Sequence, residues 1–206
     1  MTATDQALAS SSRIPLSLRG PAPANVVIGY GFWLFLLSDI MMFAALFAAY
    51  AVLADATAGG PAGPQLFDKG RVLLETACLL ASSFTCGLGS LAVQRGARGP
   101  TFGWMGVTFV LGLAFLVLEV NEFAGLVAAG NGPTRSAFLS AFFTLVGTHG
   151  LHVTAGLLWL VVMMLQIITL GFRPMVIRRM FCFGLFWHAL DIVWVGVFTI
   201  VYLGAH

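Results

Sequence analysis

Five long apolar stretches dominate this chain of 206 residues. About 20 apolar residues in a helix, rising about 1.5 Å each, cross the ~30 Å hydrocarbon core of a bilayer. A strand would leave amide groups unpaired in lipid, so each crossing must be a helix. We therefore expect an all-α, polytopic membrane protein, a bundle of five transmembrane helices. The expected spans are residues 27–53, 72–93, 102–127, 138–170 and 181–203.

Composition excludes most other classes of protein. The chain is 59% hydrophobic and only 9% charged, whereas a soluble domain carries about 25% charged residues. Disordered chains are polar and highly charged, so disorder is excluded as well. The net charge of +2 comes with no basic cluster, and we expect no nucleic acid partner. Three cysteines without a C-x-x-C motif favour neither a disulfide framework nor a metal site.

Two regions are expected. Residues 1–26 are small and polar and are interpreted as a flexible cytoplasmic tail, and residues 27–206 form the bundle. Orientation follows from the basic residues of short loops. One side of the membrane has seven: Arg13, Arg19, Arg95, Arg98, Arg173, Arg178 and Arg179. The other side has three, namely Lys69, Arg71 and Arg135. This bias predicts a cytoplasmic N-terminus and, after five crossings, a periplasmic C-terminus.

Ionisable residues lie inside the predicted spans, where each costs about 2.5–3.5 kcal/mol unless it faces protein and has a partner. Their depths, calculated from the helical rise, place both Asp39 and His152 roughly 21 Å from the outer surface. We expect a buried polar layer near mid-membrane, contributed by four of the spans. Its members are Asp39, Glu119, Glu122, His149, His152, His188 and Asp191.

Spacing groups these residues further. Glu119 and Glu122 lie three residues apart and share a helix face, as do His149 with His152 and His188 with Asp191. Two carboxyls one turn apart in a low dielectric do not both ionise, so at least one of the two glutamates is expected to be protonated.

Other charged residues have simpler interpretations. Glu75 stands four residues after Arg71, which predicts an ordinary ion pair at the outer interface. The cytoplasmic residues Arg173, Arg178 and Arg179 are candidates for binding anionic lipid headgroups.

Three interpretations of the polar layer remain open from the residues alone. The first is interhelical hydrogen bonding that fixes the packing. The second is metal or haem binding by His149, His152 and His188, although no Glu-x-x-His motif of a di-iron site is present. The third is a proton or ion path through the bundle.

Four sequence segments carry a resemblance to a known family. They are GFWLFLLSDIMMF at 31–43, LEVNEF at 118–123, NGPTRSAFLSAFFTLVGTHGLHV at 131–153 and LFWHALDIVW at 185–194. Together they closely resemble subunit III of haem–copper terminal oxidases, over about residues 28–206. With five spans, where the longer cytochrome c oxidase form has seven, the chain resembles the quinol oxidase branch of the family, the cytochrome o (bo-type) ubiquinol oxidases.

The resemblance implies an accessory, non-redox subunit without catalytic residues, metal or cofactor of its own. Haem and copper are then expected in the catalytic subunit I, with subunits II and IV and membrane phospholipids as further partners. The family is linked to stabilising the catalytic subunit, holding lipid and sustaining proton uptake in the aerobic respiratory chain of the bacterial inner membrane. Asp39 matches the family's first-span acid, where cytochrome c oxidases usually carry Glu.

Alternatives to this resemblance also remain. The close one is subunit III of a cytochrome c (caa3-type) oxidase, or a related nitric-oxide-reductase accessory protein. The others are a haem-bearing membrane cytochrome that uses the histidine cluster, and an autonomous transporter.

Overall fold

Five membrane-length helices form the fold, as the sequence predicts. The computed structural model describes residues 24–59 and 68–204, and no strand occurs in those ranges. All five helices are long and apolar enough to cross a membrane. They are α2 (Ala24–Leu53), α4 (Lys69–Gln94), α5 (Arg98–Ala128), α6 (Ala137–Leu170) and α7 (Pro174–Val197), and α7 continues into a π-helical turn, η2 (Phe198–Leu203).

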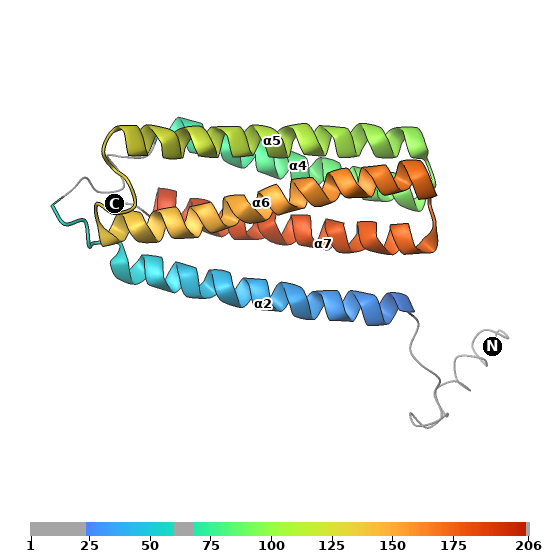
Figure 1. The fold of residues 1–206 in the computed structure, drawn as a ribbon, viewed down its shortest axis with the longest axis horizontal. Helices are drawn as coiled ribbons and strands as arrows, with labels where there is room; N and C mark the ends of the chain where they lie inside the picture. Colours follow the sequence, from blue (N-terminus) through green and yellow to red (C-terminus); the bar gives the residue numbers. More distant parts are fainter. Residues whose placement is uncertain (1–23, 60–67, 205–206) are drawn as a thin grey trace, which may run out of the picture.

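Four of the helices pack together and the fifth lies against them. Figure 1 shows α4 to α7 side by side, with α2 running along the outside of this group. α2 contacts α6 and α7 and is the least buried of the five spans. One end of the bundle holds the end of α2, the start of α4 and η2, and the other holds the start of α2.

The helices begin earlier than the apolar pattern predicts, by seven residues in the case of α7. Hydrogen bonding, not hydropathy, sets a helix start. Asp68 caps α4 by accepting from the amide of Gly70 at 3.0 Å, and Ser136 caps α6 by accepting from Leu139 at 3.2 Å. Pro174 occupies the first turn of α7, where its missing N–H is no loss.

Of the predicted tail, residues 1–23 lie outside the described ranges, and the last three residues belong to α2.

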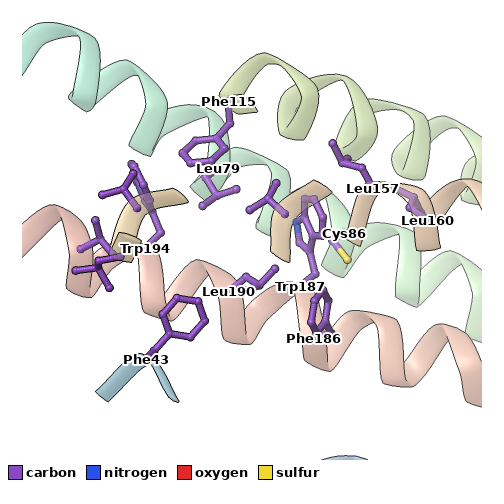
Figure 2. Close-up of a cluster of buried hydrophobic side chains, with 14 of the residues drawn as sticks. Phe43, Leu79, Cys86, Phe115, Leu157, Leu160, Phe186, Trp187, Leu190 and Trp194 are labelled. Carbon is purple, nitrogen blue, oxygen red and sulfur yellow. The ribbon is translucent and has the colours of Figure 1, made fainter. Parts of the chain in front are cut away.

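The core is built around two tryptophans of α7 (Figure 2). Trp187 and Trp194 are almost completely buried. Gly156 of α6 makes room for the first of them, because a Cβ there would lie 2.9 Å from the Trp187 ring. Both indole N–H groups donate to hydroxyls of α4, at 3.1 Å to Ser82 and 3.1 Å to Thr76. The indoles thus tie α4 and α7 together without leaving a buried donor unpaired.

Candidate functional site

The predicted polar residues form separate groups rather than one layer. The groups lie between different sets of helices, and the depth of a residue along its helix does not decide which group it joins. One group joins α2 to α6, a second joins α4 to α7, and a third lies between α4, α5 and η2.

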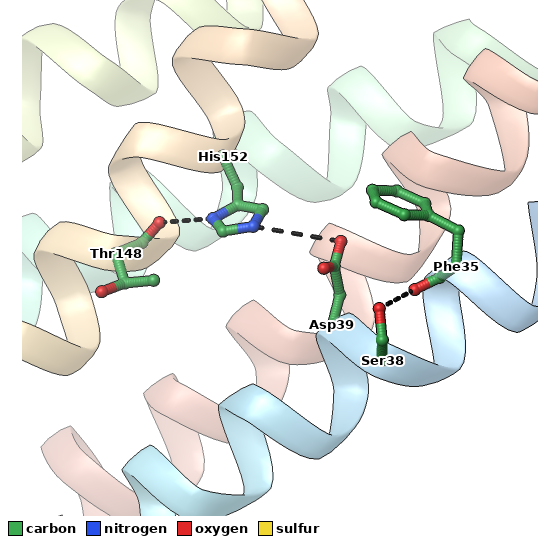
Figure 3. A network of polar contacts seen from close by, with 5 residues as sticks. All are labelled: Phe35, Ser38, Asp39, Thr148 and His152. Carbon is green, nitrogen blue, oxygen red and sulfur yellow. Dashed lines mark hydrogen bonds and ion pairs between the residues drawn. The ribbon is translucent and has the colours of Figure 1, made fainter.

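Asp39 of α2 faces His152 of α6, the residue predicted at the same depth (Figure 3). His152 Nε2 lies 3.9 Å from Asp39 Oδ2, and each side chain is 23% exposed. On the other side of the ring, Nδ1 lies 2.8 Å from the carbonyl oxygen of Thr148. A carbonyl only accepts, so Nδ1 carries the hydrogen. A neutral ring then turns a lone pair toward Asp39, and a closer contact needs one proton between the two groups.

His188 and Asp191 face α4 instead. His188 Nδ1 lies 2.7 Å from the hydroxyl oxygen of Ser83. Ser83 and His188 also interact with the half-buried Asp191 carboxyl. Ser83 is not among the site residues predicted from the sequence, because α4 carries several small hydroxyl residues and periodicity alone does not separate them.

His149 belongs to the core. Its side chain is fully buried, and Nε2 donates to the carbonyl oxygen of Leu190 over 3.2 Å. The rings of Phe115 and Trp194 stand 5.6 Å and 5.0 Å from it. This histidine therefore joins α6 to α7 through the backbone, and it has a different partner from His152.

A third group contains Glu119 and Glu122, both almost fully buried. The hydroxyl of Tyr202 donates to Glu122 Oε2 at 3.1 Å. Glu75 joins them from α4, and the interpretation of Glu75 as an interfacial ion pair with Arg71 is wrong. Glu75 has no exposed surface, and neither of its oxygens has a hydrogen-bond partner in the described structure.

The reason for this error is the helix start. α4 begins at Lys69, three residues before the predicted span, which puts Glu75 roughly 9 Å inside the helix. Its face of α4 continues into the buried Leu79, Ser82 and Cys86. That spacing of four, seven and eleven residues is the signal in the sequence that points to an inward-facing carboxyl.

No metal centre is found in residues 24–59 and 68–204, where no three or more His, Cys, Asp or Glu side chains lie close enough together to hold an ion. The three histidines that the metal or haem interpretation requires have separate partners: Leu190 for His149, Thr148 and Asp39 for His152, and Ser83 for His188.

A cavity of about 530 Å³ lies between α2, α4 and α7, at the end of the bundle where α2 begins. Its lining is mostly apolar, with Ile28 and Phe181 among the contributors, and Arg178 and His188 add polar groups. Of the three predicted headgroup arginines, Arg178 lines this cavity and its buried Nε has no hydrogen-bond partner in the described structure. The other two, Arg173 and Arg179, are exposed.

Comparison with known proteins decides the family. The family model described as cytochrome c oxidase subunit III matches residues 18–206. The chain belongs to this family. The resemblance to subunit III of haem–copper oxidases is thereby confirmed.

Curated members of the subunit III family cover most of the chain. The cytochrome bo(3) ubiquinol oxidase subunit 3 of Pseudomonas aeruginosa is 58% identical over 174 residues, which cover 84% of this chain and 83% of that protein. The quinol oxidase subunit 3 of Bacillus subtilis is 42% identical over 173 residues, covering 84% and 85%. The cytochrome c oxidase subunit 3 of Bacillus sp. (strain PS3) is 43% identical over 173 residues, covering 84% of each chain.

Proposed function

We propose that this chain is the accessory, non-redox subunit III of a proton-pumping haem–copper quinol oxidase, a ubiquinol:O2 oxidoreductase of the aerobic respiratory chain. The observation that carries the proposal is the 58% identity with the ubiquinol oxidase subunit of Pseudomonas aeruginosa over five-sixths of the chain. The five membrane-length helices in residues 24–59 and 68–204 agree with it. One observation favours a cytochrome c oxidase instead, the 43% identity with the subunit of Bacillus sp. (strain PS3).

The polar groups of the bundle support an accessory role. Several of the imidazoles and carboxyls contact a hydroxyl, a backbone carbonyl or one another across neighbouring helices, and these contacts support a role in helix packing. Electron transfer then belongs to subunit I, which supplies the haem and copper. Subunits I, II and IV of the complex are partners for the apolar surface that α2 leaves exposed. We place the complex in the bacterial inner membrane with the N-terminus in the cytoplasm, on the strength of the basic residues in the loops.

The cavity supports a lipid-holding role. Its apolar walls fit an acyl chain of a membrane phospholipid, and it lies at the predicted cytoplasmic end of α7. The guanidinium of Arg178 provides hydrogen-bond donors for an anionic headgroup at the edge of the membrane. The Asp39–His152 pair, in which a closer contact would require a proton between the two groups, supports the further proposal that this subunit sustains proton uptake by the complex.

Purification through an affinity tag on this chain tests the function. We expect a mild detergent extract to contain larger subunits with haem absorbance, and the complex to oxidise ubiquinol with reduction of O2. A complex that oxidises reduced cytochrome c but not ubiquinol would favour the cytochrome c oxidase instead. A haem absorbance that stays with this chain after its partners are removed would contradict the accessory role.

A further inference from the structure

Three carboxyls meet inside the bundle at the end where α2 connects to α4. Glu75 lies on α4, and Glu119 and Glu122 lie on α5. Their positions, counted from the helix ends, put Glu75 and Glu122 each roughly 9 Å inside the helix, with Glu119 one turn deeper. Each of the three is close enough to another to interact electrostatically, and all three act on the Tyr202 hydroxyl.

Several of these oxygens have no hydrogen-bond donor in the described structure. Both oxygens of Glu75 and Oε2 of Glu119 are buried without a partner. Glu75 has no exposed surface at all, and Glu119 has 3%. A buried polar group without a hydrogen bond costs about 1–3 kcal/mol, and a charged one costs more. Such groups in proteins are normally satisfied by internal water, by a bound proton, or by both.

The charges around the site require protons. The charged and titratable groups that face the three carboxyls are Arg71 and Asp68 at the start of α4 and Tyr202 on η2. If all three glutamates were ionised, one guanidinium would face three buried negative charges, with Asp68 adding a fourth at the helix cap. Like charges in a low dielectric repel strongly, so the site cannot stay fully ionised.

The fold also makes room for this arrangement. α6 faces Glu119 with Gly150, where a Cβ would lie 2.5 Å from Glu119 Oε1. The π-helical turn, a feature often found at functional sites, carries Tyr202 to Glu122, whose carboxyl accepts a hydrogen bond from the Tyr202 hydroxyl. Glu122 is thus the best placed of the three to stay ionised, and Glu75 and Glu119 are left to hold protons.

We propose that Glu75, Glu119 and Glu122 form an internal proton-binding site, in which Glu75 and Glu119 carry exchangeable protons and internal water bridges them to the Glu122 carboxylate. The site takes its protons from water at the predicted periplasmic end of the bundle. It goes beyond the proposed function, since all of its groups belong to this chain and lie apart from the lipid cavity and from the Asp39–His152 pair.

Infrared difference spectroscopy of the assembled complex tests the proposal, with the wild type compared to Glu75→Gln and Glu119→Gln at neutral pH. Glutamine keeps the size of the side chain and removes the proton-binding oxygen. We expect each variant to lose one carbonyl-stretch component of a protonated carboxyl, which in the wild type shifts on exchange into D2O. Asp55→Asn is the matched control, because Asp55 is an exposed carboxyl at the same end of the bundle; it should lose none.

The same spectra give the outcomes that overturn the proposal. Identical protonated-carboxyl bands in the wild type and in both glutamine variants would show that these groups are ionised. Where a glutamine variant does not assemble, Gly150→Ala decides the question, since it keeps all three acids and presses on Glu119. We expect it to shift the frequency of one protonated-carboxyl band, and an unshifted band would overturn the proposal.

Discussion

The Tyr202 hydroxyl donates a hydrogen bond to the Glu122 carboxyl across 3.1 Å, and so joins the last turn of the chain to α5. The two residues are 80 positions apart, and both are buried. Because the two residues are so far apart in the sequence, this hydrogen bond holds η2 against α5 and closes one end of the bundle.

Loss of this bond should weaken that end. We expect Tyr202→Phe to destabilise the subunit by about 1–3 kcal/mol, because the carboxyl loses its donor while it stays buried. The effect is measured as the temperature at which this subunit is released from the assembled complex on heating. Tyr30→Phe is the control, since the Tyr30 side chain on α2 is 68% exposed. Equal transition temperatures for the two variants would contradict a stabilising role for the Tyr202 hydroxyl.

The Asp39–His152 pair should matter for assembly and durability more than for chemistry. We expect Asp39→Ala or His152→Ala to lower the yield of assembled complex, or the time over which it turns over, while the initial rate stays near that of the wild type. The reason is that either change leaves the other half-buried polar group without its partner. Normal assembly combined with abolished initial turnover would instead make these residues catalytic.

A second substitution at Asp39 separates hydrogen bonding from charge. Asn presents an N–H that His152 Nε2 accepts without any added proton, because Nδ1 already donates to Thr148. We expect Asp39→Asn to restore most of the assembly that Asp39→Ala loses. The yields of the two variants, measured side by side after one purification, check this. A yield of the Asn variant no better than that of Ala would indicate that the charge is needed.

The difference between depth and direction sets the limit of sequence-based prediction here. Span length alone predicts five helices, because lipid tolerates no other arrangement of long apolar segments. Depth also predicts that Asp39 and His152 meet. Depth does not give the rotation of each helix about its axis, so it merges His188 and Glu119 into one layer, although they face different neighbours. It also misplaces Glu75, because the predicted span starts three residues after the helix does.

Close packing around Trp187 gives a prediction about glycine. We expect Gly156→Ala to destabilise the bundle by about 1–3 kcal/mol, because the added methyl group would lie 2.9 Å from a fully enclosed indole that has no room to move. Gly106→Ala is the matched control in a neighbouring helix, where a Cβ meets nothing within 4 Å. Thermal unfolding of the two variants in the same detergent compares them, and an equally stable pair would contradict the packing argument.

The last prediction concerns the cavity between α2, α4 and α7. Arg178 lines it, whereas Arg179, next in sequence, is exposed and donates to the side chain of Gln166 at 3.1 Å. If Arg178 holds an anionic headgroup, Arg178→Gln should reduce the phospholipid that co-purifies with the complex, and Arg179→Gln should leave it unchanged. Mass spectrometry of lipids extracted from equal amounts of the two complexes makes the comparison. An equal loss in both variants would mean that the arginines attract lipid only through general surface charge, since a specific site requires the guanidinium that faces the cavity.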